Sequence, residues 1–285
     1  LGAMEGLEAD PSDDSTTRCE RPANADYTAF LQADALRGAR IGIPRAMYYD
    51  SVQVPGRDSF RGGLGDEARA VMDEAIQILE AQGAIIVDPA NIPSVVDPDP
   101  ETSLLTNGGS SVLSYGMKRD FNAWLATLGD DAPVRTLTEL REWNEASRNL
   151  GSLKYDQANL DRSDAIDLEG DRARYEEARA RDLLLHGERG IDAAMAEHEL
   201  DALLFPRSSS AGIAARPGYP TVIVPFAQVG VSEAAAASFP EGFEPRPAPY
   251  GVSFTGGACS EPTLIGLAYA FEQATMRRVA PEHFR

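Results

Sequence analysis

The spacing of apolar positions predicts a strand, a helix and a second strand in the first third of the chain. Residues 40–44 (RIGIP) form a short apolar run that ends in proline, and residues 84–88 (AIIVD) form another. Between them, residues 67–82 carry apolar side chains at the i, i+3, i+4, i+7 spacing of a helix with one buried face. Gly83 then ends the helix. This order predicts a β-α-β unit with a right-handed crossover.

The middle of the chain has the spacing of helices, over residues 110–128, 136–149 and 172–199. We expect the last of these to break near Gly187 or Gly190, because glycine interrupts helices. These segments predict a mostly helical insertion over residues 110–199.

Strands return after the insertion. The apolar runs are residues 201–206 (DALLFP), 220–225 (PTVIVP) and 252–255 (VSFT), and a last helical pattern covers 261–277. Residues 1–36 are polar and interrupted by Pro11 and Pro22, which predicts an irregular lead-in. Strands that alternate with helices indicate an α/β fold.

The charge balance changes which partners are expected. The 285 residues have a formal net charge of -19, with 43% apolar and 25% charged residues, which is typical of a globular protein. Such acidity opposes binding of phosphate backbones, so we expect no nucleic-acid partner. No apolar run approaches the roughly 18 residues of a membrane span, so none is predicted.

Metal and cysteine chemistry receive little support from the sequence. Cys19 and Cys259 are too few for a disulfide framework or a zinc site. The three histidines, at positions 186, 198 and 283, lack the spacing of metal ligands. We therefore expect no metal and no cofactor.

Two serine clusters invite comparison with a hydrolase nucleophile. Ser110 and Ser111 follow two glycines, but they also precede a helical pattern, and we expect one of them to cap that helix. Lys118, a potential base, lies beside Arg119 and Asp120, which predicts a solvated position. The serines at 208–210 directly follow a buried strand, where α/β proteins contact ligands, although loop solvation is the plainer interpretation.

Six segments, taken in order, resemble the amidase signature family of serine amidohydrolases, which cleave carboxamides with a Ser, cis-Ser, Lys triad. They are DYTAFL with LRGARIGIPR (26–45), DEAIQILEAQGAIIVD (73–88), LSYGMKRDFNAWLATLGDDAPVRTL (113–137), GIDAAMAEHELDALLFP (190–206), GYPTVIVPFA (218–227) and YGVSFTGGACSEPTLIGLAYAFEQAT (250–275). The segments most resemble the peptide amidase branch. At Gly116 the chain departs from relatives, which often carry an acid there.

The resemblance implies that residues 1–285 are the C-terminal part of a single amidase domain, with a twisted mixed sheet covered by helices on both faces. No triad residue can be assigned to this chain, and the triad is expected in an N-terminal part of the same enzyme that precedes Leu1. The substrate would be a small amide or a peptide amide. The resemblance places these residues in the walls of the substrate cleft: Tyr115, Phe121, Trp124, Phe205, Ser208 and Ser209.

Two other functions stay open at this point. One is a non-catalytic domain that keeps the amidase fold and binds a ligand or a partner. The other is the A-type subunit of a tRNA-dependent amidotransferase, which the acidity of the chain disfavours. The sequence does not identify a compartment; the cytoplasm is the default expectation, and an upstream secretion signal would lie outside this chain.

Overall fold

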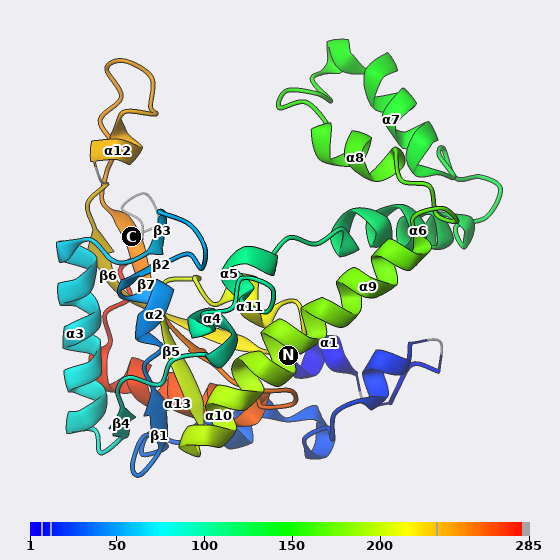
Figure 1. Ribbon diagram of the computed structural model, residues 1–285. Helices are drawn as coiled ribbons and strands as arrows, with labels where there is room; N and C mark the ends of the chain where they lie inside the picture. Colours follow the sequence, from blue (N-terminus) through cyan, green and yellow to red (C-terminus); the bar gives the residue numbers. More distant parts are fainter. Residues whose placement is uncertain (7, 12, 232, 281–285) are drawn as a thin grey trace. The chain divides into compact units, whose positions relative to one another are not determined.

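The computed structural model describes residues 1–6, 8–11, 13–231 and 233–280. The chain forms two compact units, which are treated separately below (Figure 1). Unit 1 comprises Leu1–Asn107 and Leu184–Arg285, and unit 2 comprises Gly108–Leu183. The predicted helical insertion therefore overlaps unit 2 and extends beyond it into unit 1.

Unit 1 contains the strands and most of the short helices. Its strands are β1 (Arg40–Gly42), β2 (Ser51–Gln53), β3 (Phe60–Gly62), β4 (Ile85–Val87), β5 (Ala202–Pro206), β6 (Thr221–Val229) and β7 (Ala248–Thr255). Its helices are α1 (Gly2–Glu5), α2 (Arg45–Tyr48), α3 (Asp66–Ala81), α4 (Pro93–Val96), α5 (Leu104–Asn107), α10 (Asp192–His198), α11 (Ala211–Ala214), α12 (Glu233–Ala236) and α13 (Glu261–Thr275). The lead-in contains 3-10 turns at Asp14–Thr17, Ala23–Ala25 and Tyr27–Phe30.

Five strands form one mixed sheet in the order β4-β1-β5-β7-β6. β1 is parallel to both neighbours, with Ile41 opposite Ile86 of β4 and Ala202 of β5. β7 is antiparallel to β5 and to β6. The parallel pairing of β1 and β4 confirms the predicted β-α-β unit, and helices flank the sheet, with α3 in contact with β4 and β6 and α13 in contact with β6 and β7.

Burial explains why the central strands read as unbroken apolar runs. All five residues of β5 are buried, as expected for a strand covered on both faces. At the sheet edge, β6 alternates instead, with Val224 and Phe226 buried and Ile223 50% exposed. The edge strand therefore turns one face toward the core and the other outward.

Helix α3 follows its sequence pattern closely. Its buried side chains are Met72, Ala75, Ile76 and Leu79, which share one face. Gly83 follows the helix with φ of +90°, the left-handed region that favours glycine after a helix end. Its predicted role is confirmed.

The antiparallel β2–β3 hairpin was not predicted. Each of its strands has three residues, and those of β3 are all exposed, so no period-two pattern of burial exists to be read. Gly62, at the end of β3, has φ of +74°, and a side chain there would overlap the carbonyl group of Met47. Backbone packing, rather than hydrophobic spacing, fixes this hairpin.

Unit 2 is helical, with α6 (Val112–Ala126), α7 (Leu137–Ala146), α8 (Ala158–Asp164), α9 (Arg172–Asp182) and a 3-10 turn at Arg148–Leu150. α6 packs against α7, α8 and α9, and its Tyr115 stacks on Tyr175 with ring centroids 4.3 Å apart. A wide helical turn, Leu183–Ile191, follows α9, and its Gly190 has non-helical backbone angles. The break expected near Gly187 or Gly190 is confirmed, whereas α8 was missed.

Lys118 does not lie on a free face of its helix, contrary to the sequence-based expectation of a solvated position. Its Nζ donates to the carbonyl oxygens of Asp164 (2.5 Å) and Ile166 (2.7 Å), and lies 3.8 Å from the carboxylate of Asp164. The side chain crosses from α6 to the end of α8, because the last carbonyls of that helix need donors. The prediction of a solvated position for Lys118, made because Arg119 and Asp120 are its neighbours in the sequence, was therefore wrong.

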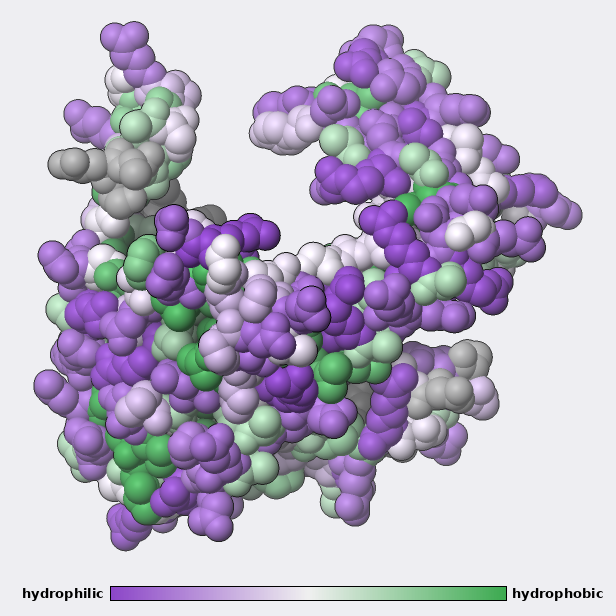
Figure 2. Space-filling view, in the orientation of Figure 1, coloured by the Kyte–Doolittle hydropathy of each residue, from purple (hydrophilic) through white to green (hydrophobic). Residues whose placement is uncertain are grey.

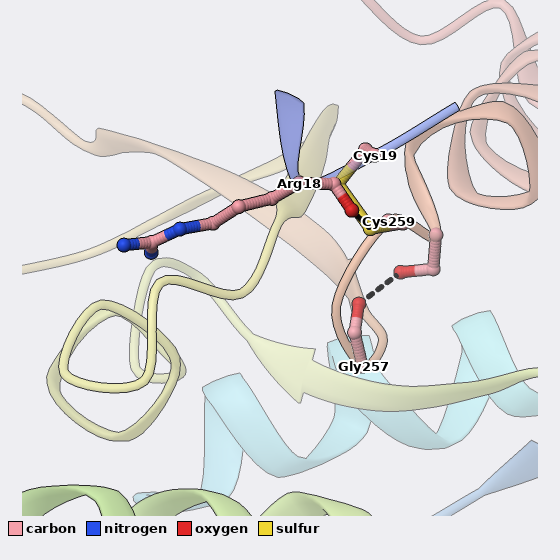
Figure 3. Close-up of a disulfide and its surroundings, with 5 residues drawn as sticks. Arg18, Cys19, Gly257 and Cys259 are labelled. Atoms are coloured by element: carbon pink, nitrogen blue, oxygen red, sulfur yellow. Dashed lines mark hydrogen bonds between the residues drawn. A yellow bond between two sulfur atoms is a disulfide. The ribbon is translucent and has the colours of Figure 1, made fainter. Parts of the chain in front are cut away.

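Cys19 and Cys259 form a disulfide, which the sequence did not indicate. Their Cα atoms are 5.4 Å apart although the residues are separated by 240 positions. Figure 3 shows the bond tying the segment at Arg18 to the turn at Gly257 that precedes α13. The bond therefore anchors the lead-in to the turn between β7 and α13.

Figure 2 shows hydrophilic residues over most of the face in view, as the strong negative charge leads one to expect. No helix within the described part of the chain is long and apolar enough to cross a membrane. The same described residues contain no group of three or more His, Cys, Asp or Glu side chains placed to hold a metal ion.

Candidate functional site

A pocket of about 530 Å³ in unit 1 lies where β5 ends. Its walls come from the residue after β5, the start of α3, the end of β6 and the start of β7. Its lining residues include Arg207, Tyr250, Glu67 and Gly230. The position fits the general preference of α/β folds for ligands at the carboxyl ends of strands.

Arg207 is fixed by the backbone of the neighbouring strand. It has φ of +51°, its N–H donates to the carbonyl of Gly251 (2.8 Å), and its own carbonyl accepts a hydrogen bond from the Ser253 hydroxyl. Both partners belong to β7, so the sheet itself determines how the chain leaves β5. The guanidinium group then lies over the ring of Tyr250, 5.5 Å from the centroid.

Tyr250, one of the residues that line this pocket, has a buried phenol. The residue is 1% exposed, and its hydroxyl has no hydrogen-bond partner within the described residues. Burial raises the pKa of the phenol, and the positive charge of Arg207 opposes that rise only in part. The hydroxyl therefore stays protonated at neutral pH, as a buried donor without an acceptor among the described residues.

The opposite wall is held by the start of α3. Glu67 accepts a hydrogen bond at 2.9 Å from the backbone N–H of Gly230, just beyond β6. Asp66 is the first residue of the helix, where a negative charge is stabilised by the helix dipole. The pocket thus combines one cation, one buried donor and two carboxylates around an apolar floor.

The serines predicted to contact substrate occupy the turn after β5. Ser208 and Ser209 are exposed, whereas Ser210 is fully buried. The Ser210 hydroxyl lies 3.4 Å from that of Thr221, which in turn bonds to Thr255 at 2.9 Å. The third serine therefore packs the turn onto the sheet, while Ser208 and Ser209 remain accessible for contact.

Phe205, the other unit 1 residue predicted to line the substrate cleft, lies within the hydrophobic core. It is fully buried and meets the ring of Tyr48 edge to face, with centroids 4.6 Å apart. It supports the turn at residues 207–210 from beneath.

The unit 2 residues of the predicted cleft lie on α6. Tyr115 is buried, and its hydroxyl donates to the carbonyl of Leu168 at 2.6 Å. Phe121 and Trp124 lie together with centroids 5.6 Å apart, and Trp124 is 53% exposed. At Gly116 a side-chain carbon would meet only Asp120, at an ordinary 3.5 Å, so the helix has room for a side chain at this position.

Sequence reasoning did not single out Arg207, Tyr250 or Glu67. Arg207 follows a predicted strand directly, and Tyr250 precedes the last one, so their positions at strand ends were the available signal. Only the antiparallel pairing of β5 with β7 shows that these two ends meet.

Ser110 and Lys118, which were considered as a nucleophile and its base, have other hydrogen-bond partners. The Ser110 hydroxyl donates to Asp182 (2.7 Å) and accepts from the N–H of Val112 (3.2 Å). Ser111 occupies the N-cap position of α6 but makes no capping hydrogen bond with its side chain, so the predicted cap is not formed by the N-cap residue. The hydroxyl of Ser110, one residue earlier, binds the first N–H of the helix instead. Lys118 donates to the carbonyl oxygens of Asp164 and Ile166.

Known proteins resemble the chain over almost its whole length. No family model matches it. A protein described as a probable amidase, from Arabidopsis thaliana, is 28% identical over 275 residues, which are 96% of this chain and 45% of the relative. The native peptide amidase from Stenotrophomonas maltophilia is 30% identical, with a TM-score of 0.70 over 96% of this chain and 50% of that one.

A third comparison bears on the fold alone. An amidase family protein from Bacillus anthracis is 23% identical, with a TM-score of 0.67 over 97% of this chain and 46% of its own. The mixed sheet flanked by helices is thus an architecture shared with amidases. The chain is related to the enzymes of the amidase signature family, and it spans about half the length of the relatives it matches.

Proposed function

We propose that the chain is the C-terminal part of a serine amidohydrolase that converts a carboxamide to an acid and ammonia or an amine. The observation that carries the proposal is the continuous match to peptide amidase over 96% of this chain. The proposal assigns the Ser, cis-Ser, Lys triad to an N-terminal part of the same enzyme. That part would supply the attacking hydroxyl and the oxyanion hole.

The role proposed for the present chain is to supply strands and cleft walls. The turn with Ser208 and Ser209 would line one side, and Tyr115, Phe121 and Trp124 of α6 another. The substrate would be a small amide or a peptide amide, selected by the shape of an apolar cleft. A solved relative, a peptide amidase, is complexed with the competitive inhibitor chymostatin.

The exposed edge of the sheet at β6 is consistent with the proposal that an N-terminal part of the enzyme packs there. β6 pairs only with β7 among the described strands, and its Ile223 side chain is 50% exposed. A sheet edge with apolar side chains on an open face is a surface that further protein would cover.

A non-catalytic binding domain is the alternative that one observation favours. The pocket lined by Tyr250 offers the cation of Arg207, and its lining residues include no paired nucleophile and base. Such a site suits recognition of an acceptor-bearing ligand more than bond cleavage. In this alternative the amidase fold is kept for binding alone.

One experiment separates the two functions. The coding sequence directly upstream of the Leu1 codon is read, and any longer in-frame product is expressed and supplied with a peptide amide while ammonia release is measured. Ammonia release that disappears when the upstream serine is replaced by alanine supports the amidase. A folded long product that releases no ammonia, or a stop codon directly before Leu1, overturns the proposal in favour of the binding domain.

A further inference from the structure

A second cavity, in unit 2, has a charge opposite to that of the chain. Its volume is about 580 Å³, within the roughly 300–1,000 Å³ of small-molecule sites. Three arginines line it, Arg162, Arg174 and Arg181, against a single carboxylate, that of Glu177. In a protein with a formal net charge of -19, this is a local concentration of positive charge.

The helix geometry brings these arginines together. Arg174 and Arg181 are seven residues apart on α9, so they share one face, and Glu177 lies between them. Arg162 comes from the last turn of α8. Guanidinium groups from two helices therefore border the same cavity, although each repels the others unless an anion lies between them.

The arginines are only partly engaged by the protein. Arg162 bonds to the side chain of Asn159 at 3.0 Å, a neutral partner. Arg181 reaches the carbonyl of Gly109 at 3.3 Å and the carboxylate of Glu177 only at 3.8 Å. Among the described residues, Arg174 has no ion pair, and the Nε of Arg181 is buried without an acceptor.

That buried Nε is an independent sign of a missing acceptor. A guanidinium N–H removed from water without a hydrogen bond destabilises the folded protein, so such atoms are rare in the absence of a ligand. Ser110, Ser111 and Ser114 border the same cavity at the start of α6, and Ser111 and Ser114 add hydroxyl donors. Asp182 lies behind them, where the Ser110 hydroxyl already donates to it at 2.7 Å.

We propose that unit 2 binds a small multivalent oxyanion, with phosphate or carboxylate groups held between Arg162, Arg174 and Arg181 and contacted by the serine hydroxyls at the start of α6. Arginine suits this chemistry because its planar fork donates two parallel hydrogen bonds to such groups. Three cations match a ligand with two or more negative charges better than a monovalent ion. The site is separate from the Tyr250 pocket and does not depend on the proposed amidase activity.

Calorimetric titration of the full chain tests the proposal, with inorganic phosphate, inorganic pyrophosphate and citrate as probes. Pyrophosphate or citrate should bind more tightly than phosphate, and added salt should weaken the binding because the contacts are ionic. The variant with R174Q and R181Q together should bind at least about tenfold more weakly. R172Q is the matched control, since Arg172 is exposed on the same helix but does not line the cavity.

Absence of binding by all three anions overturns the proposal, as does equal binding by the R174Q/R181Q and R172Q variants. A second measurement uses the unaltered protein in case the double variant does not fold. Bound pyrophosphate or citrate should protect Arg174 and Arg181 from phenylglyoxal, while Arg172 continues to react. Equal modification of the three arginines with and without anion contradicts the site.

Discussion

Cys19 and Cys259 are joined by a disulfide that closes a loop of 240 residues, from the lead-in to the turn before α13. Because a cross-link between distant residues restricts the unfolded chain, its removal should lower the free energy of unfolding, by about 2–5 kcal/mol. Thermal unfolding followed by circular dichroism, with and without a reductant, measures this change.

The matched variant for this prediction is the double substitution C19S with C259S. It should unfold at the lower temperature of the reduced protein and should no longer respond to reductant. An unfolding temperature that reductant leaves unchanged in the parent chain would show that the bond does not restrain the lead-in. Disulfides persist in oxidising conditions, so under those conditions neither Cys19 nor Cys259 should titrate as a free thiol.

Tyr250 and Tyr49 should respond in opposite ways to replacement by phenylalanine. Both are buried, but the Tyr49 hydroxyl donates to the carbonyl of Leu204 at 2.9 Å, whereas that of Tyr250 has no partner among the described residues. Y49F should destabilise the chain by about 1–3 kcal/mol, and Y250F should be neutral or stabilising. Urea denaturation of the two variants in parallel provides the measurement. A larger loss for Y250F than for Y49F would contradict the assignment of an unpartnered hydroxyl.

Asp164 should make unit 2 sensitive to acid. Burial raises the pKa of this carboxyl, but hydrogen bonds from Thr138 and Arg141 and the charges of Lys118 and Arg141 outweigh burial, so the pKa is lowered. A lowered folded-state pKa contributes stability that is present above the unfolded value, about 3.9, and is lost as the pH falls through the folded value.

D164N should therefore be less stable than the parent chain at pH 7, and the difference should shrink as the pH is lowered from about 5 to 3. Tryptophan fluorescence during urea denaturation reports on unit 2, because both tryptophans of the chain, Trp124 and Trp143, lie there. D130N is the control, since the Asp130 side chain is 98% exposed. A difference that stays constant over this pH range would rule out the linkage.

Gly251 should not tolerate a side chain, because the side chain of Ile223 on the neighbouring strand packs against it. A carbon added at Gly251 would lie 2.6 Å from Cγ1 and 2.7 Å from Cδ1 of Ile223 on β6. G251A should therefore destabilise unit 1 by about 1–3 kcal/mol through overpacking. The half-exposed Ile223 can be shortened, so adding I223A should recover part of the loss. Free energies of unfolding for the two single variants and the double variant measure the coupling, and simple additivity would argue against a direct clash.

The sequence alone determined the elements whose burial is periodic or continuous. Helix α3 was predicted over residues 67–82 and runs over Asp66–Ala81, and β5 was predicted over 201–206 and runs over Ala202–Pro206. In both, the side chains that leave water are set by the local period of the backbone. The resemblance of six ordered segments to the amidase signature family also implied the α/β fold, which the chain shares with a peptide amidase.

Only the tertiary structure decided which distant groups meet. The pairing of β5 with β7 brings Arg207 to Tyr250, the crossing of α6 and α8 brings Lys118 to Asp164, and the turn before α13 receives Cys19. None of these contacts repeats at a helical or strand period, so no local pattern records them. The exposed β2–β3 hairpin escaped prediction for the same reason, because backbone contacts rather than apolar spacing hold it. Local periodicity therefore fixed the elements, whereas long-range packing fixed the sites.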